Sequence, residues 1–381
     1  MNKVILLGGN HHNGLGLVRS FGRHGIKPYG IIIGNGSEDS FVAKSKFWKK
    51  TWSVKTEEDA LRIILDSFAN ETPRPVIIPW SDGAAKIVDT NYDRLSKHFI
   101  VPSINNLQGE IFRLMNKEEQ ILFASSNSLR MLPSKIYKTC EEKNPMIKFP
   151  VILKPVTSVE GKKSDMSICF DIDNFRKSIN ELKAKGFERI LVQKYLDTKT
   201  EYLLTGSISD RRYSFSLARN IRQWPPNFGT FSFSETETED YMKNFCCDVL
   251  DRIAKAGYRG PIDIEIFKDG NDELYINEFN WRSSGRNFIS KHTHVESAYM
   301  YYCDIVGIDY RDKLFNDISM CIMNEITDIK HVFRKELSFW RWLLDLKKTR
   351  SFAVWDLRDP RPAFKRYRIM ISRYLKGEDK R

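Results

Sequence analysis

The 381-residue chain is poor in cysteine and has no long apolar run. Its six cysteines, at positions 140, 169, 246, 247, 303 and 321, form no Cys-x-x-Cys pair, which argues against a disulfide framework and a zinc site. No apolar run approaches the roughly 20 residues of a membrane-spanning helix. Residues 1–7 are apolar but lack a small-residue cleavage site, so they predict a buried first strand. These absences favour a cytoplasmic protein with reduced thiols.

Two ligand-binding patterns are also missing. The glycine-rich turn 8–16 leads from that strand into a predicted helix over 15–24, but it lacks the Gly-x-Gly-x-x-Gly spacing. The next predicted strand, 28–33, ends without the acid that a dinucleotide site needs. We therefore predict a βαβ unit without nicotinamide binding. His292 and His294 have no third ligand at zinc spacing and are interpreted as capping or surface residues.

The positive charge is concentrated at one end of the chain. The net charge of +12 invites a nucleic-acid or membrane partner. Residues 331–381 hold 15 Lys and Arg against 6 Asp and Glu, a net of +9, so the first 330 residues carry only +3. The tail reads as an amphipathic helix over 339–348, a break over 351–362 and a basic, aromatic helix over 363–376. Such helices either dock on the protein body or lie on an anionic membrane. Because no RNA- or DNA-binding module is recognised, we expect no nucleic-acid partner.

The most informative stretch runs from residue 260 to residue 285. Two alternating apolar runs, 262–267 and 274–279, flank a Lys-Asp-Gly-Asn-Asp turn and predict a β-hairpin. The hairpin carries three oxygen donors, and two arginines follow: Glu265, Glu278, Asn280, Arg282 and Arg286. Mg²⁺ takes oxygen ligands and often pairs one or two carboxylates with nucleotide phosphates. A solvated hairpin with acids on its wet face would show the same spacing.

Basic residues precede this hairpin at positions suited to anions. Lys117 opens a predicted helix. The apolar strand 149–155 ends in Lys154 and Pro155, so the Lys154 ammonium is held at a rigid position of the backbone. The loop 156–165 has one glycine and two lysines. Its lysines either contact phosphate or belong to a basic surface loop without that role. Arg219 and Arg222 suit bidentate recognition of a carboxylate or phosphate, or charge protection of an edge strand.

Other segments complete the pattern. An apolar strand from residue 189 runs through Gln193 into Lys194, Tyr195 and Leu196, and Glu201 opens the strand after it. Polar residues also follow the predicted strands of the first unit. The candidates for substrate contact there are Asn10, Asn13 and Asp82, with Ser81 or Asp82 as a helix N-cap in the alternative.

Taken in their order along the chain, the motifs resemble the ATP-grasp superfamily over residues 1 to about 310. The branch they resemble most is that of carbamoyl-phosphate synthetase and D-aspartate ligase. The resemblance implies Mg-ATP binding with one or two Mg²⁺ ions on Glu265, Glu278 and Asn280. It implies phosphate contacts by Lys117 and Lys154. It implies nucleotide contacts by Gln193, Lys194, Tyr195 and Leu196. In relatives, adenine binds the backbone at positions matching 194–196, and an acid matching Glu201 holds ribose. The substrate or its acyl phosphate would contact Arg282, Arg219 and Arg222.

The fold implied is mixed, α/β and α+β. An N-terminal Rossmann-like pre-ATP-grasp domain is expected over 1–106, and an ATP-grasp domain over 107–327, with a lid at about 118–195. A basic, aromatic C-terminal extension is expected over 328–381.

The activity implied is that of an ATP-dependent carboxylate–amine ligase, which forms an amide through an acyl phosphate. The carboxylate and amine would be small molecules or groups linked to a sugar or peptide, and cell-surface polymer synthesis is one setting. A homodimer and peripheral contact of the tail with the inner membrane surface stay open. The alternative is a non-catalytic ATP-binding regulator or scaffold, which the glycine-poor loop favours and the acidic set disfavours.

Overall fold

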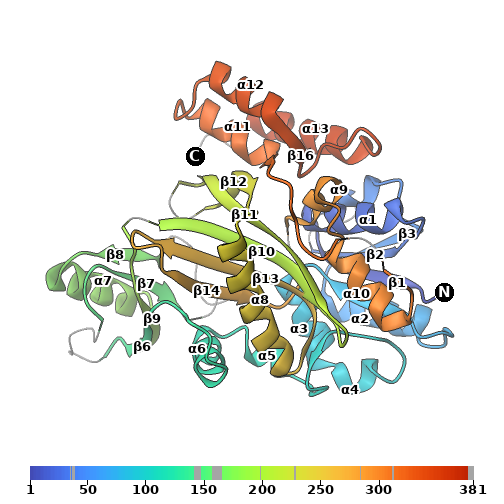
Figure 1. Cartoon of the computed structure of the whole chain (residues 1–381), viewed down its shortest axis with the longest axis horizontal. Helices are drawn as coiled ribbons and strands as arrows, with labels where there is room; N and C mark the ends of the chain where they lie inside the picture. The colour runs from blue at the N-terminus through green and yellow to red at the C-terminus, as the bar shows by residue number, and fades with distance from the viewer. Residues whose placement is uncertain are drawn as a thin grey trace. The chain divides into compact units, whose positions relative to one another are not determined.

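A computed structural model describes residues 1–34, 36, 39–140, 147–156, 165–197, 199–226, 229–283, 285–310 and 313–375. Residues 157–164, which make up most of the loop proposed to contact phosphate, lie outside the described residues. The chain forms two compact units, each built from segments that are distant in sequence (Figure 1). Unit 1 contains Met1–Ile111, Leu203–Asp263 and Asn280–Arg381, and unit 2 contains Phe112–Tyr202 and Ile264–Phe279.

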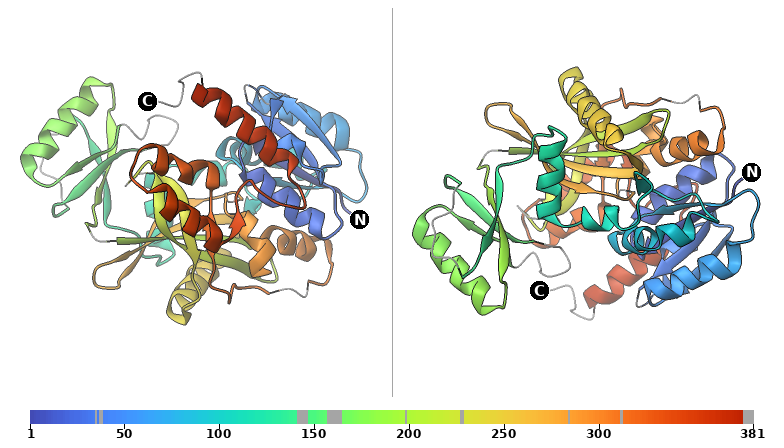
Figure 2. Two further views of the ribbon diagram at one scale, coloured as in Figure 1. Left: turned by 90° about the horizontal axis from the view of Figure 1, so that it is seen from above. Right: turned by 90° about the horizontal axis from the view of Figure 1, so that it is seen from below.

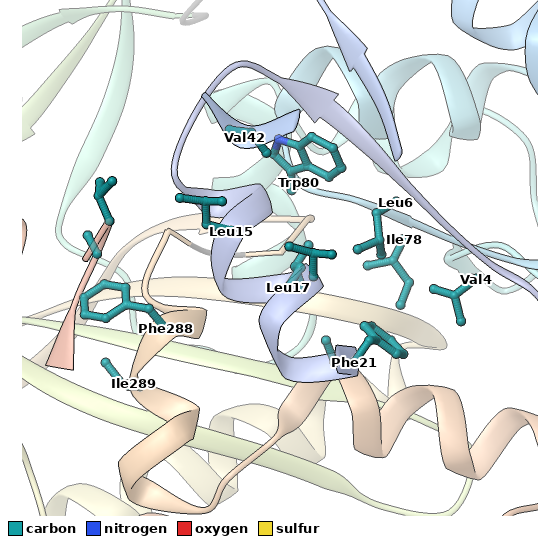
Figure 3. Close-up of a cluster of buried hydrophobic side chains, with 14 of the residues drawn as sticks. Val4, Leu6, Leu15, Leu17, Phe21, Val42, Ile78, Trp80, Phe288 and Ile289 are labelled. Carbon is teal, nitrogen blue, oxygen red and sulfur yellow. The ribbon is translucent and has the colours of Figure 1, made fainter. Parts of the chain in front are cut away.

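Unit 1 opens with a parallel sheet in the order β3-β2-β1-β4. Its elements are β1 (Val4–Gly9), α1 (Asn13–Arg23), β2 (Tyr29–Ile33), η2 (Val42–Lys44), β3 (Lys50–Val54), α2 (Glu57–Phe68), β4 (Val76–Pro79), α3 (Asp82–Thr90) and α4 (Tyr92–Leu95). Val4 and Leu6 enter a core with α1 (Figure 3), whereas Ile5 and Leu7 enter a second core with α2 and α3. Because helices cover both faces, β1 reads as a continuous apolar run. The predicted strand–helix–strand order is confirmed.

A second, larger sheet has the order β14-β13-β10-β11-β12-β15-β16, and β5 pairs with β13. The elements are β5 (Ser103–Ile104), β10 (Lys199–Ile208), β11 (Tyr213–Trp224), β12 (Thr230–Thr236), α8 (Asp240–Lys255), β13 (Tyr258–Asp269), β14 (Leu274–Asn280), η4 (Asn287–Ile289), α9 (Ser290–Thr293), α10 (Ser297–Val306) and β15 (Cys321–Met323). Strands β13 and β14 are the predicted hairpin. Ile262, Ile264 and Ile266 are fully buried, as their shared face requires.

Unit 2 contains an antiparallel sheet in the order β6-β9-β7-β8. Its elements are α5, which runs over Glu110–Arg113 at the boundary, α6 (Lys117–Ser126), β6 (Ser134–Lys138), β7 (Val151–Pro155), β8 (Ser167–Cys169), α7 (Ile172–Ala184) and β9 (Arg189–Lys194). Helix α7 lies along this sheet (Figure 2) and buries Phe175, Ile179 and Leu182 against its strands. The Asn116 side chain caps α6 by accepting a hydrogen bond from the Glu118 N–H, and this cap sets Lys117 as the first helical residue.

The C-terminal tail belongs to unit 1. It forms α11 (Glu325–Phe333), α12 (Phe339–Lys348), β16 (Thr349–Phe352) and α13 (Arg361–Leu375), which group together in Figure 1. The predicted break over 351–362 is wrong at its start, because Ser351 and Phe352 belong to β16 and pair in parallel with β15. A strand of four residues has too few alternations to reveal itself. A buried ion pair, Arg19 Nε to Asp359 Oδ2 at 3.0 Å, also ties the tail to α1, so docking on the body is observed.

No helix in the described ranges is both long enough and apolar enough to cross a membrane.

Candidate functional site

Lys154, a predicted phosphate ligand, lies in unit 2. It lies on β7, and its Nζ donates to Gln193 Oε1 on the paired strand β9 at 2.7 Å. Gln193 Nε2 in turn donates to Ser134 Oγ at 3.0 Å, so the amide is oriented for the lysine. Burial, with a smaller contribution from the nearby Lys117, lowers the pKa of Lys154 to about 8, and the Glu278 carboxylate opposes part of this shift. An ammonium this desolvated gains from any anion that reaches it.

A small pocket in unit 2 collects both predicted phosphate ligands, Lys117 and Lys154, and one predicted metal ligand, Glu278. It is lined by Lys117, Gln120, Ile121, Met131, Ser134, Lys154, Leu191, Gln193, Asn277 and Glu278. Its volume is about 10 Å³, room for roughly one water molecule. The pocket therefore marks where two lysines and a carboxylate converge, and a phosphate chain would need it to widen.

Asn277 is a residue of this pocket that the sequence reasoning missed. Its Nδ2 donates to Glu265 Oε2 at 2.9 Å, while its Oδ1 is buried with no hydrogen-bond partner among the described residues. A buried carbonyl oxygen without a donor is costly unless a cation or a ligand donor reaches it. The signal was present, since Asn277 interrupts an apolar face between Tyr275 and Phe279.

This donor set fits a hard divalent cation. Within the described ranges no three or more His, Cys, Asp or Glu side chains form a metal-binding group. The two predicted carboxylates are those of Glu265 and Glu278. The amide oxygen of Asn277, which the sequence did not indicate, is a further oxygen donor. Mg²⁺ commonly takes one or two carboxylates and completes its shell with phosphate oxygens and waters. Asn280, the third predicted ligand, is the last residue of β14 and belongs to unit 1.

The predicted adenine segment begins at Lys194, the last residue of β9. The Lys194 N–H donates to Pro133 O at 2.8 Å, and the Tyr195 N–H donates to Pro150 O at 2.9 Å. The Leu196 N–H makes no hydrogen bond within the described part of the chain. Its side chain packs with Leu132 in a small apolar cluster.

Glu201, the predicted ribose ligand, lies on β10. Its carboxylate pairs with Lys199 Nζ at 2.8 Å. The Lys199 ammonium also lies 4.1 Å from the centre of the Phe267 ring. The Glu201 carboxylate therefore already has a cationic partner on its own strand.

In unit 1 Arg282 joins three acceptors. Its Nε donates to Asp82 Oδ1 at 3.1 Å, its Nη1 to Asp263 Oδ2 at 3.1 Å and its Nη2 to Asn280 Oδ1 at 3.2 Å. The structure thus brings together three predicted residues, Asn280 and Arg282 from one segment and Asp82 from a distant one. Asp263 was missed, although it alternates with the buried isoleucines of β13.

The glycine-rich turn after β1 holds a second unsatisfied group. His12 is buried, and its Nε2 has no hydrogen-bond partner among the described residues. Burial, with smaller contributions from His11 and Arg366, lowers the pKa of His12 well below its ordinary value, so the imidazole is neutral. A neutral ring with an open nitrogen offers one polar contact to a ligand.

The candidates from the first unit have local partners. Asn13 Nδ2 donates to Trp80 O at 3.2 Å, and Asn10 Oδ1 accepts from Ser40 Oγ at 2.6 Å. Ser81 is the N-cap of α3, as the alternative reading expects. Asp82, the first residue of α3, contacts Arg282 instead of capping the helix.

Arg219 and Arg222 both lie on β11 but in different surroundings. Arg219 forms an exposed pair with Glu235 at 2.9 Å. Arg222 pairs with Asp328 at 2.8 Å and with Asp345 at 2.7 Å, and both carboxylates are buried. Burial alone would lower the pKa of Arg222, but the two carboxylates raise it. Arg222 therefore anchors α11 and α12, a role the sequence did not indicate, and its contact with substrate stays a prediction.

Sequence similarity to a known protein covers part of the chain. No protein-family model matches the chain. A D-alanine–D-alanine ligase from Campylobacter lari is 26% identical over 174 residues, which are 43% of this chain and 49% of that protein. The matched part thus spans about half the length of that relative.

Solved structures share the fold over a longer part of the chain. N5-carboxyaminoimidazole synthetase from Staphylococcus aureus superposes with a TM-score of 0.66 over 88% of each chain at 16% identity. The chain has the ATP-grasp fold. The ATP-grasp biotin carboxylase of Campylobacter jejuni gives a TM-score of 0.63 over 82% of this chain and 74% of its own, at 14% identity. L-amino acid ligase from Bacillus licheniformis gives 0.59 over 79% and 73%, also at 14% identity. The predicted ATP-grasp fold is confirmed.

Proposed function

We propose that this chain is an ATP-dependent carboxylate–amine ligase. One observation carries the proposal: on an ATP-grasp fold, Lys117, Lys154 and Glu278 converge in one pocket of unit 2. Two lysines are suited to phosphate oxygens, and carboxylates are suited to the metal that accompanies them. The names of the similar proteins, which are ligases and carboxylases, support the same class of reaction.

The proposed roles follow from these positions. Lys117 and Lys154 bind the phosphates of ATP. Adenine binds the segment after Gln193, formed by Lys194, Tyr195 and Leu196, with the Leu196 N–H as the donor. Glu201 holds ribose hydroxyls, and one or two Mg²⁺ ions bind Glu265, Glu278 and Asn280. The metal, when bound, neutralises phosphate charge, and Arg282 and Arg219 are the proposed contacts of the substrate carboxylate or its acyl phosphate.

The reaction is a phosphoryl transfer followed by an acyl transfer. A carboxylate oxygen of the substrate attacks the γ-phosphorus of ATP, and ADP leaves. The amine nitrogen then attacks the acyl carbon, the C–O bond to phosphate breaks, and the amine loses a proton. Such steps depend on positioning and charge neutralisation, so the protein needs no covalent nucleophile. The substrates are proposed as small molecules or groups linked to a sugar or peptide, with cell-surface polymer synthesis as a setting.

The domain plan stays part of the proposal. Residues 1–106 would form the Rossmann-like pre-ATP-grasp domain, 107–327 the ATP-grasp domain and 328–381 an extension. Contact of that extension with the inner membrane surface is supported by the exposed side chains of Phe339, Trp340 and Leu344 on α12. Aromatic and basic side chains together suit a headgroup interface, and sedimentation with anionic vesicles tests this.

ADP release tests the ligase function directly. We expect sustained release only when ATP, Mg²⁺, a carboxylate and an amine are all present, because the acyl phosphate forms only with a carboxylate in place and is consumed only when an amine attacks it. The measurement is a coupled ADP assay over a panel of amino acids and sugar acids. Nucleotide binding without ADP release on any pair would favour the alternative, an ATP-binding regulator or scaffold.

Nucleotide affinity should depend on pH through Lys154. The pKa of about 8 in the free protein means that the ammonium is present below pH 8 and lost above it. If phosphate binds only the ammonium, affinity is flat below pH 8 and falls up to tenfold per unit above it. Calorimetry with a non-hydrolysable ATP analogue and Mg²⁺ at pH 7 and 9.5 measures this fall.

The matched variant is Lys154→Met. It should bind the analogue more weakly at pH 7 and lose most of the pH dependence. If wild type and variant show the same fall above pH 8, another group is responsible for it.

A further inference from the structure

A second pocket lies within unit 1 and contains none of the residues proposed for catalysis. Its volume is about 200 Å³, many times the room that one water needs. Residues of α1, η4, α9, β16 and the segment after β16 surround it. Aromatic and basic side chains meet there, including Phe288, Lys291, His292, Arg350, Phe352 and Trp355. A pocket of this composition suits a ligand with a planar apolar part and a negative charge.

Most of the charge in the pocket wall is already compensated. The ion pairs are Arg19 with Asp359 at 3.0 Å, Arg23 with Glu296 at 2.7 Å and Lys291 with Asp356 at 3.2 Å. Each acid cancels one cation, so these pairs add no net charge.

Arg350 is the exception. Its side chain is exposed on β16, and its guanidinium makes no hydrogen bond or ion pair with any residue that the structure describes. It lies close enough to His292 to affect that imidazole: burial chiefly lowers the pKa of His292, then Lys291, with Arg350 among the smaller contributions. His292 is therefore neutral near pH 7 and also has no hydrogen bond within the described ranges. The pocket keeps one uncompensated positive charge.

We propose that this pocket binds a small aromatic carboxylate. One guanidinium matches one carboxylate and can bond to both of its oxygens. The Phe288 and Trp355 rings offer apolar faces for a planar group. A doubly charged phosphate fits less well, because its second charge would have no cation of its own and would face Asp356. The site is separate from the proposed nucleotide site and does not depend on it.

Calorimetry on the full chain without nucleotide tests the proposal, with benzoate as the probe and benzamide as its neutral counterpart. We expect benzoate to bind and benzamide to bind at least about tenfold more weakly, because benzamide lacks the charge that Arg350 recognises. Arg350→Gln should weaken benzoate binding by about tenfold or more. Lys347→Gln, a charge loss at an exposed position of α12, should leave it unchanged.

A third variant separates this site from the nucleotide site. Glu278→Gln should bind benzoate like the wild type, whatever its effect on ATP chemistry. The proposal is overturned if benzoate does not bind at millimolar concentration or if benzamide binds equally well. It is also overturned if Arg350→Gln binds benzoate like the wild type, or if Glu278→Gln abolishes binding.

Discussion

The Glu278→Gln variant should lose ADP release by about 10²- to 10³-fold while folding normally. Glu278 lies on β14 beside Lys154 and lines the pocket with both lysines. Glutamine keeps the shape but removes the negative charge that would hold Mg²⁺ against the phosphates, and losing one such electrostatic contact costs a factor of this size. The measurement is the steady-state rate of ADP release at saturating Mg²⁺. Thermal unfolding should match the wild type because the side chain is only half-buried.

The same hairpin offers the control. Glu273 precedes β14 and pairs with Arg130 at the exposed end of the hairpin, outside the pocket. Glu273→Gln should release ADP at the wild-type rate. A Glu278→Gln variant with undiminished turnover would show that Glu278 is not a ligand of the metal.

The Arg222→Met variant should lower the free energy of unfolding by about 3–5 kcal/mol. Arg222 supplies the cation for two buried carboxylates, Asp328 on α11 and Asp345 on α12. Methionine fills similar space but leaves both acids without that partner, and breaking a buried pair has a cost of this order. Ser232 Oγ still donates to Asp328 at 2.7 Å, which softens the loss without supplying charge. Denaturant unfolding followed by tryptophan fluorescence measures the change.

Arg219→Met is the matched control on the same strand. Its pair with Glu235 is exposed on both sides, so its loss should change stability by no more than about 1 kcal/mol. Equal effects of the two substitutions would contradict the anchoring role of Arg222. If Arg222→Met is as stable as the wild type but releases no ADP, the original prediction of a substrate contact would gain support.

Local pattern was sufficient for the elements that follow a period. The alternation of Ile262, Ile264 and Ile266 predicted a strand with one buried face, because neighbouring side chains of a strand point to opposite sides. The Ser81 cap and the helix over 339–348 could also be predicted from a few adjacent residues. The ATP-grasp resemblance rested on the order of such local motifs along the chain.

Tertiary structure decided the partners. Arg222 meets Asp328 and Asp345, which lie 106 and 123 residues further along the chain, and no local period connects them. Tertiary structure also accounts for β16, a strand of four residues that forms because it pairs in parallel with β15. An isolated strand of that length leaves its backbone groups unpaired, so its sequence alone does not specify it.

The residue types along the chain indicate which groups could do chemistry, whereas the fold sets which of these groups meet. Lys154 was predictable as an anion ligand from the strand that ends in Pro155. Its pKa of about 8 was not, because that value arises from burial and from charges brought close by other elements. Likewise Asn277 is an ordinary polar strand residue in the sequence. Only the packing around it leaves its Oδ1 buried and without a donor, which makes it a candidate ligand.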